Sequence, residues 1–446
     1  MTDTPFPLSR CSSVTRRRFL STLGAGVAVA SAGAYGVSVW GRNPDGTGIP
    51  AVGTPTTTTT RVPIPAGAIG TPAAGNRTLI VIEMGGGNDS LNMVVPHADS
   101  RYYELRSALA IAEPIDLDGD VGLHPALPFV ADRYQAGQVA VVEGVGYPNP
   151  DLSHFASMAT WWSGARDASV GTGWLGRFLD GTVGTADPLA GVTIGPGPTP
   201  ALLGDTSFQV SVQDMTGLSP RIPQWIDTRE ELLGLWQGFA PADFDGAAAL
   251  NPVRHAIEAT ASAQATLNDL LGAPDVSDPV VTARRQRSDL ERSIEVAAAL
   301  ATSPVAPRVI YLHGWGDFDT HEGQSDRHAA MMSQLNAAFE QLFAALESAG
   351  VAERVVVMTT SEFGRRTASN GSGTDHGTAG SHFVLGSAVT GGRYGEPSSL
   401  NNLDARGNLV HTVDYRSLYA SILDGWMEAP AEALLDGTFE TLPLFT

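Results

Sequence analysis

Short apolar runs that alternate with longer helical patterns constrain the fold more than any other feature of the sequence. The apolar runs lie at 78–83, 139–143, 309–312, 354–359 and 383–385. Their length and β-branched content are typical of strands buried on both faces. Helical periodicity predicts helices at 127–136, 154–162, 252–271, 280–300, 328–349 and 415–426. This alternation predicts an α/β fold of three layers, α/β/α, around a mostly parallel central sheet.

The composition excludes several chemistries. The net charge is -20, and all 27 basic residues are arginines. Without a lysine, the chain cannot form a Schiff base with pyridoxal phosphate or complete a Walker A loop. The acidic balance argues against nucleic acid as a partner, because phosphate backbones require a basic surface. The single cysteine, Cys11, leaves the rest of the chain without a disulfide or a cysteine nucleophile.

The N-terminal 42 residues have the pattern of an export signal. The run Thr15-Arg16-Arg17-Arg18-Phe19-Leu20 fits the twin-arginine pattern, and an uncharged stretch rich in small residues follows it to Gly41. We expect 1–42 to be a twin-arginine signal peptide, or an uncleaved anchor that is the chain's one membrane contact. The protein would then be periplasmic, bound to the cell envelope or secreted.

A second segment without apolar periodicity follows the signal. Residues 43–76 are dense in Pro, Thr, Gly and Ala, with threonine at every position from 56 to 60. Such a composition predicts a disordered linker, because it offers too little apolar surface to offset the entropy of ordering. The folded part would be a single domain over 77–446.

Polar segments follow four of the predicted strands. Because the carboxyl ends of parallel strands meet at one edge of a sheet, we expect these segments to form one site. Their aspartate, glutamate and histidine side chains are ligands of zinc and other divalent ions. The segments are Gly85 to Asn92, Asn149 to Phe155, His313 to His321, and Ser361 to Arg365 with Thr374 to Gly377 and His382 behind it.

Each segment also has an ordinary structural explanation. The glycines of 85–87 could form a tight turn, and Ser153 could cap the helix that it precedes. The run Asp319-Thr320-His321 could be a surface turn. Glu362, directly after an apolar strand, is harder to explain in this way. A shared site accounts for all four segments at once.

Six motifs together resemble the domain-of-unknown-function 1501 family. The resemblance covers about 79–427. It implies the alkaline-phosphatase-like fold of the phosphatase and sulfatase superfamily, with an α/β/α core and a site for one or two metal ions. The motifs are Gly86-Gly87-Asn88-Asp89-Ser90-Leu91-Asn92, Leu123-His124-Pro125-Ala126-Leu127, Ser153-His154-Phe155, Asp319-Thr320-His321, Thr360-Ser361-Glu362-Phe363-Gly364-Arg365 and Thr374-Asp375-His376-Gly377.

The resemblance also implies roles for individual residues. Ser153 corresponds to a nucleophile at a helix N-terminus, where backbone N–H groups favour an anion. Arg365 would clamp an anionic oxygen. One or two zinc, calcium or manganese ions are expected, and the implied ligands are Asp89, Asp319, His321, Glu362, Asp375 and His376, with Asp317 and His382 in reserve.

The sequence departs from the superfamily pattern in three places. Gly316-Asp317-Phe318 lengthens the run before Asp319, so Asp317 could take its place. Phe363 stands where phosphatases carry a second histidine ligand, which puts one metal position in doubt. The chain also lacks the C/S-x-P-x-R motif that sulfatases convert to formylglycine.

The sequence favours one function and leaves two alternatives. The favoured function is an exported, metal-dependent hydrolase acting on a phosphate or sulfate ester or a related small anion. The first alternative is a serine esterase of the Gly-Asp-Ser-Leu type with Ser90 as nucleophile, although Asn88 replaces the glycine of that block. The second is a non-catalytic envelope protein that keeps the fold.

Export is predicted to depend on Arg16 and Arg17. Residues 1–50 fused to a reporter should leave the cytoplasm only when the twin-arginine pathway is active. Replacing Arg16 and Arg17 together by lysine should abolish export, since the pathway reads the arginine pair. Reporter activity outside the cytoplasm in the doubly substituted fusion would contradict the assignment.

Overall fold

The computed structural model describes residues 77–165, 171–184, 187–212 and 289–445, with a few single positions between 262 and 270. The predicted signal, the predicted linker, most of the predicted helix at 252–271 and the start of the one at 280–300 lie outside the described residues. Within the described ranges, no helix is long and apolar enough to cross a membrane. The elements below belong to one compact unit of the chain.

A nine-stranded sheet forms the centre of this unit. Its order is β11-β5-β10-β9-β1-β8-β6-β7, and β12 pairs with β5. The strands are β1 (Thr78–Glu83), β5 (Val139–Gly146), β6 (Gly191–Ile194), β7 (Val210–Val212), β8 (Val309–Leu312), β9 (Val355–Thr360), β10 (Gly380–Leu385), β11 (Gly392–Tyr394) and β12 (Val413–Asp414). Every pairing is parallel except the two made by β10, with β5 and β9. Among the described strands of this sheet, β10 alone runs against the others.

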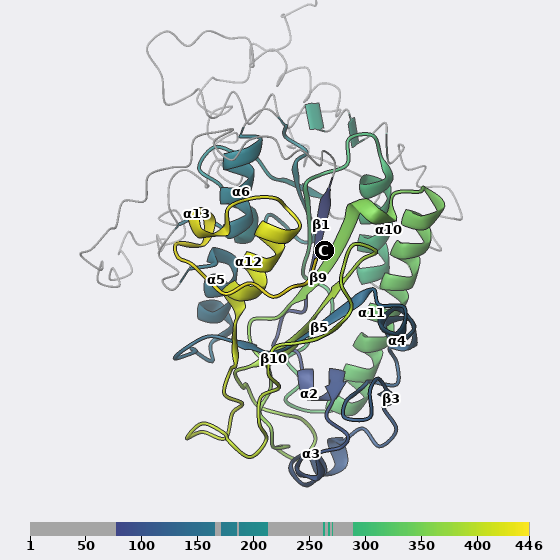
Figure 1. Ribbon diagram of the computed structural model, residues 1–446, viewed down its shortest axis with the longest axis vertical. Coiled ribbons are helices and arrows are strands. Elements are labelled where there is room, and N and C mark those ends of the chain that lie inside the picture. Colours follow the sequence, from purple (N-terminus) through teal and green to yellow (C-terminus); the bar gives the residue numbers. More distant parts are fainter. Residues whose placement is uncertain are drawn as a thin grey trace, which may run out of the picture. The chain divides into compact units, whose positions relative to one another are not determined.

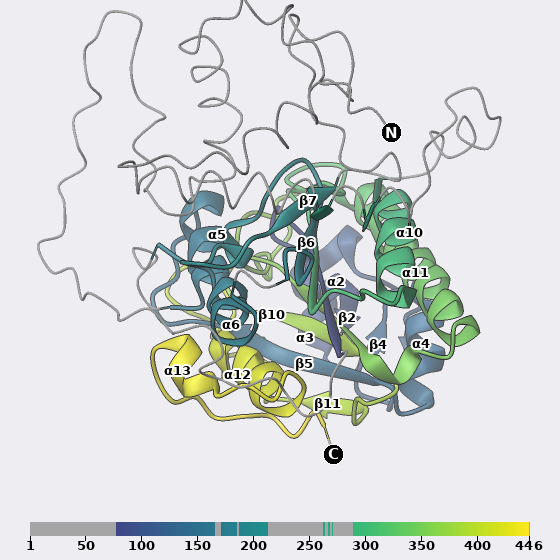
Figure 2. The ribbon, with the colours of Figure 1, turned by 90° about the horizontal axis from the view of Figure 1, so that it is seen from above.

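Helices cover both faces of the sheet (Figure 1, Figure 2). One face carries α4 (Pro128–Gln135), α10 (Asp289–Thr302) and α11 (Gln324–Ser348), and the other carries α5 (His154–Ser163), α6 (Trp174–Thr182), α12 (Tyr415–Gly425) and α13 (Ala431–Leu435). Successive residues of β1 point to opposite faces. Ile80 and Ile82 pack into the core under α11, while Leu79 and Val81 pack under α12. The predicted three-layer α/β/α fold is confirmed, with a mixed and mostly parallel sheet.

A smaller sheet and several short helices complete the described structure. The small sheet has the order β2-β4-β3, from β2 (Val94–Val95), β4 (Gly122–Leu123) and β3 (Ile115–Asp116). The short helices are α2 (Ser90–Met93), α3 (Ser100–Arg106) and the 3-10 turns Ser107–Leu109, Pro200–Leu202 and Ala352–Arg354. Periodicity did not predict these elements or β6, β7, β11 and β12. Apart from α3, which has seven residues and spans about two turns, they have two to four residues, which is too short a pattern.

The sheet topology brings the predicted polar segments to one edge. Strands β9, β1 and β8 are neighbours and parallel, so their carboxyl ends lie side by side. Strand β5 runs in the same direction, because β10 is antiparallel to both β5 and β9. The amino end of β10 lies at this edge for the same reason. The loop that carries His376 therefore returns to the edge where the loop after β8 begins.

A buried carboxyl group ends the first strand. Glu83 Oε2 accepts hydrogen bonds from the Tyr311 hydroxyl at 2.6 Å and from Trp162 Nε1 at 2.7 Å. Burial raises the pKa of Glu83 to about 7, the two hydrogen bonds oppose this shift, and the nearby Glu362 adds to it. Proton binding at Glu83 is therefore coupled to folding.

Replacing Glu83 by glutamine should flatten part of the pH dependence of stability. The folded pKa of Glu83 lies above its unfolded value, so its contribution is fully present below pH 4.5 and is lost as pH rises through about 7. A shift of this size lowers the free energy of unfolding by roughly 3 kcal/mol over that interval. Urea unfolding at pH 5 and pH 8, with a chelator present, should show this loss in the native protein. An equal loss in Glu83→Gln would contradict the assignment.

Candidate metal centre

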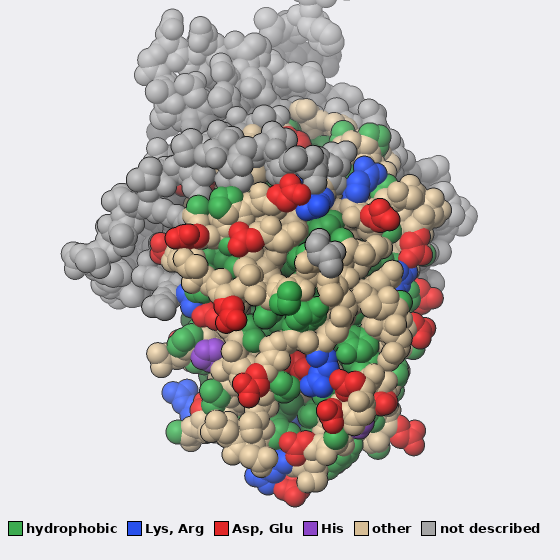
Figure 3. All heavy atoms as spheres, in the orientation of Figure 1, with side chains coloured by type: hydrophobic (Ala, Val, Ile, Leu, Met, Phe, Trp, Pro, Cys, Tyr) green, Lys and Arg blue, Asp and Glu red, His purple; other side chains and the backbone are tan. Residues whose placement is uncertain are grey.

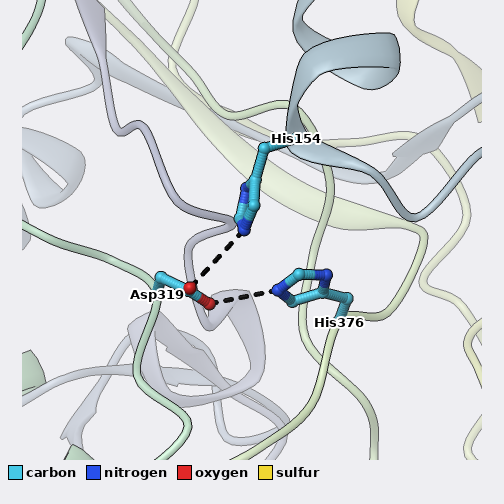
Figure 4. Close-up of side chains that lie close together, drawn as sticks. All are labelled: His154, Asp319 and His376. Carbon is cyan, nitrogen blue, oxygen red and sulfur yellow. Dashed lines mark hydrogen bonds and ion pairs between the residues drawn. The ribbon is translucent and has the colours of Figure 1, made fainter.

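Three side chains from distant segments converge at the carboxyl edge of the sheet. They are His154 in the first turn of α5, Asp319 in the loop after β8, and His376 in the loop before β10 (Figure 4). Their possible ligand atoms all lie within 4.8 Å of one another. His376 Nε2 is 3.1 Å from Asp319 Oδ1, and His154 Nε2 is 3.6 Å from Asp319 Oδ2.

A fourth side chain, His321, lies beside these three. Its Nε2 is 2.9 Å from Asp319 Oδ1 and 3.0 Å from His376 Nε2. Three imidazole Nε2 atoms therefore face one carboxylate. We call His154, Asp319, His321 and His376 the histidine–aspartate cluster.

Each histidine of the cluster has an acceptor on its other ring nitrogen. Nδ1 of His154 is 2.7 Å from Glu362 Oε1, Nδ1 of His376 is 2.8 Å from the Leu152 carbonyl, and Nδ1 of His321 is 3.3 Å from Asp375 Oδ1. These acceptors assign the proton of the neutral ring to Nδ1 and leave the lone pair on Nε2. Carboxylates and carbonyls hold metal-binding histidines in the same way.

Two observations test whether the cluster fits a metal ion. His154 Nε2 is buried and has no hydrogen-bond partner. His321 and His376 bring two Nε2 atoms within 3.0 Å of each other, where two lone pairs would repel without a cation or proton between them. Imidazole nitrogen and carboxylate oxygen form the donor set of zinc sites. The residues therefore fit a divalent ion.

Arg365 joins the loops that carry the cluster. Its side chain is inaccessible to solvent, and Nη2 lies 2.5 Å from Asp319 Oδ1. The guanidinium also donates to the carbonyl groups of Gly86, Gly87, Phe318 and Thr374. In this structure the guanidinium directs these donors at the protein and anchors the loops. The anion clamp expected from the sequence stays a prediction.

The same guanidinium keeps Asp319 ionised. Burial raises the pKa of Asp319, but the hydrogen bond and charge of Arg365 outweigh it, and His376 and His321 act in the same direction. The net effect lowers the pKa of Asp319 to about 2. A carboxylate that stays charged at neutral pH is the form that binds a cation.

Two predicted ligands lie behind the histidines. Glu362 is buried, and its Oε1 accepts from His154 Nδ1 and from the Gly86 N–H at 2.9 Å. Asp375 is half exposed and lies on the Nδ1 side of His321. In this arrangement both carboxylates orient a histidine and do not face Asp319.

Asp89 is the predicted ligand that the structure separates from the cluster. It forms a fully buried ion pair with Arg106, in which Nη2 lies 2.7 Å from Oδ1. Gln324 Nε2 donates to the same carboxylate. Among the described residues, no hydrogen bond or ion pair joins Asp89 to the cluster. Its charge is neutralised by a guanidinium, so the structure does not show it as a metal ligand.

Phe363 fills the place where a second histidine ligand was considered. Its ring centroid lies 5.0 Å from that of His154 and 4.9 Å from that of His376. Gly87 leaves room for this ring, since a Cβ at that position would come within 2.3 Å of it. The wall between Gly87 and the two histidines is therefore apolar.

The remaining predicted residues have separate surroundings. Ser153 is exposed, its side chain makes no capping hydrogen bond, and it directly precedes α5. Asp317 is a surface residue 2.6 Å from Arg327, so Asp319 is the aspartate of this loop that enters the cluster. His382 is buried on β10 and does not contact the cluster. Sequence reasoning missed His154, although it stood in the motif Ser153-His154-Phe155, because the role there went to the serine.

Comparison with known proteins assigns this chain to a protein family. The family model described as protein of unknown function (DUF1501) matches residues 137–436. The chain belongs to this family. The resemblance inferred from the motifs is thereby confirmed. A search of curated proteins finds no match.

Solved structures show distant likeness to this DUF1501 member. A phosphonate monoester hydrolase of Agrobacterium radiobacter is 10% identical, with 81% of this chain and 78% of that chain covered and a TM-score of 0.36. A protein in the alkaline phosphatase superfamily from Vibrio parahaemolyticus is 8% identical, with coverages of 83% and 70% and a TM-score of 0.33. The sulfatase PsFucS1 from Pseudoalteromonas sp. is 13% identical, with coverages of 82% and 71% and a TM-score of 0.34.

Substitutions should show that zinc binding depends on the cluster and not on Asp89. His154→Ala and His376→Ala should abolish stoichiometric zinc binding and the rise in melting temperature on adding zinc, because each removes a ligand atom. Glu362→Gln should weaken zinc binding by about 10- to 100-fold through the orientation of His154. Metal analysis after dialysis and thermal unfolding with and without zinc measure both effects.

Two control variants sharpen this prediction. His411→Ala removes a histidine outside the cluster and should bind zinc like the native protein. Asp89→Ala should lower stability by about 3–5 kcal/mol, because it leaves Arg106 buried without its partner. The zinc stoichiometry of Asp89→Ala should stay unchanged. Loss of zinc in this variant at temperatures where it remains folded would place Asp89 among the ligands.

Proposed function

We propose that this protein is an exported, metal-dependent hydrolase acting on a phosphate or sulfate ester or a related small anion. The observation that carries the proposal is the convergence of three histidine Nε2 atoms on the Asp319 carboxylate, each ring held through its Nδ1. Nothing in folding requires three oriented, partly exposed imidazoles to meet at one point. A metal-binding site explains both their position and their orientation.

One ion is proposed, with His154, Asp319 and His376 as its ligands. Two histidine nitrogens and a carboxylate oxygen favour zinc over calcium, which takes oxygen ligands. A second ion has no evident place, since Phe363 forms an apolar wall beside the histidines and Asp89 is paired with Arg106. Three protein ligands leave a coordination position open, as catalytic zinc sites do.

The chain's own residues supply the remaining parts of a hydrolytic site. A zinc ion bound there provides a Lewis acid and brings the pKa of a bound water or hydroxyl group toward neutrality. His321, the most exposed histidine of the cluster, can accept or return a proton at Nε2 while Asp375 holds its Nδ1. Ser153 offers an exposed hydroxyl one residue before His154, and it is the proposed nucleophile.

The surface charge supports a small anion as the substrate. Acidic side chains are spread over the face shown in Figure 3, with arginines between them. A polyanion would be repelled by such a surface, whereas a compact anion can be held by a single cation. Export by the twin-arginine route remains part of the proposal and rests on the N-terminal pattern alone.

A non-catalytic protein with a structural metal is the second candidate. It is favoured by the position of His321, whose Nε2 lies as close to Asp319 as that of His376 does. If His321 also binds the ion, four protein ligands close the site, and closed sites are typically structural. The two candidates predict different zinc contents for His321→Ala. The hydrolase should keep its zinc, and the structural site should lose it.

Zinc-loaded protein should hydrolyse at least one simple aryl ester among p-nitrophenyl phosphate, bis(p-nitrophenyl) phosphate and p-nitrophenyl sulfate. The activity should disappear with a chelator and return with zinc. Ser153→Ala and His321→Ala should each lower kcat by a factor of about 100 or more, because they remove a nucleophile and a proton carrier. Both variants should keep one zinc per chain. Ser387→Ala, at an exposed serine away from the cluster, serves as the control.

The outcomes separate the candidates. Zinc binding without turnover of any ester, together with loss of zinc in His321→Ala, would support the structural site and contradict the hydrolase. Protein that holds no metal and does not respond to added zinc, calcium or manganese would remove the basis of both.

A further inference from the structure

A cavity lies away from the histidine–aspartate cluster. It has a volume of about 570 Å³, and its wall includes Ser90, Glu143, Gly380, Ser381 and Arg393. No residue of the cluster lines it. Its volume falls within the roughly 300–1,000 Å³ typical of small-molecule sites. The metal centre does not explain this cavity.

Ser90 presents an unpaired hydroxyl group to this cavity. The residue is 5% exposed, and its side chain enters none of the hydrogen bonds found within the described part of the chain. Gly380 faces it closely, since a Cβ at that position would lie 3.1 Å from Ser90 Oγ. The backbone before Ser90 is fixed by the buried pair of Asp89 and Arg106 and by the hydrogen bond from Asn88 N to Ser361 Oγ at 2.8 Å. The backbone that carries Ser90 is therefore fixed, while the hydroxyl group makes no structural hydrogen bond.

A buried histidine lies behind the same wall. A smaller void is lined by His382 and shares Ser90, Gly380 and Ser381 with the cavity. His382 is 2% exposed, and its Nδ1 has no hydrogen-bond partner. In the tautomer with its proton on Nε2, the neutral ring carries its lone pair on Nδ1. Burial lowers the pKa of His382 to about 4, which keeps the ring neutral at pH 7.

The backbone of β10 is irregular at this point. The register of β10 against β5 shifts between Gly380 and His382. Such irregularities re-aim side chains and are frequent beside active sites. A serine without a partner and a histidine acceptor without a donor thus line one small void.

We propose that Ser90 and His382 form a second hydrolytic site, which cleaves a neutral carboxylic ester bound in the 570 Å³ cavity. Ser90 Oγ bonds to the acyl carbon while its proton passes to His382 Nδ1. The ester C–O bond then breaks, and the leaving alkoxide takes that proton. Water attacks the acyl-Ser90 ester in the same way and releases the carboxylic acid.

The charges around the cavity indicate the class of substrate. Asp99, Asp120 and Glu143 line it against one cation, Arg393. Arg393 is already paired with Glu143 at 2.7 Å and with Asp118 at 2.9 Å. An anionic ester would meet uncompensated carboxylates, whereas a neutral, hydroxylated ester would meet hydrogen-bonding groups. This substrate differs in charge from that of the metal centre, so the second site does not depend on the first.

A neutral alkyl fluorophosphonate tests this proposal, since it bonds to an activated serine and releases fluoride. The full-length protein is treated with a chelator, incubated with the probe and digested with trypsin. Because the chain has no lysine, Ser90 falls in the peptide Thr78–Arg101 and Ser381 in the peptide Thr367–Arg393. We expect one adduct per chain, located at Ser90 by fragmentation, in folded protein and not in urea.

Variants identify the role of His382. Ser90→Ala should abolish the adduct, and Ser387→Ala, at an exposed serine that does not line the cavity, should label like the native protein. His382→Gln should slow labelling by about 100-fold, within the range expected for loss of a general base. His382→Asn provides a second substitution if the first does not fold, and melting temperatures establish that the variants are native. Absence of a Ser90 adduct in folded native protein, or unchanged labelling in a folded His382 variant, would overturn the proposal.

Discussion

A buried guanidinium holds the candidate metal centre together. Arg365 bonds to carbonyl groups of the loops after β1 and β8 and of the loop before β10, and it contacts Asp319 directly. Arg365 and Gly86 are 279 residues apart in the sequence. A buried charge without such acceptors would be strongly unfavourable, so the loops must close around it. The position of Asp319 between the histidines follows from this closure.

Asp89 and Asp319 both pair with an arginine, but they differ in how far the pair leaves the carboxylate free. Arg106 forms a bidentate pair with Asp89 out of contact with solvent, and Gln324 adds a further donor. Arg365 approaches Asp319 from one side, and the carboxylate stays partly exposed beside three imidazoles. Coordination needs a free lone pair as well as a negative charge. Only Asp319 combines the two.

Orientation is what separates the histidine cluster from a chance gathering of polar side chains. Glu362, Asp375 and the Leu152 carbonyl each hold an Nδ1, so all three lone pairs are directed inward. His382 differs from these histidines, because its Nδ1 has no hydrogen-bond partner and its side chain lines the same small void as Ser90. In the cluster, a second partner decides which ring nitrogen is available for chemistry.

The sequence by itself determined the layered α/β fold and the edge at which chemistry gathers, because both depend on local patterns. Runs such as 78–83 and 309–312 are apolar over a strand's length, and the polar loops follow them directly. Asp319, His321 and His376 lie in these polar loops, and the family resemblance implied their role as ligands. Only the tertiary structure decided that His154 joins them, that Glu362 lies behind His154, and that Asp89 belongs to Arg106. Each of these depends on a partner from another segment, which no local periodicity encodes.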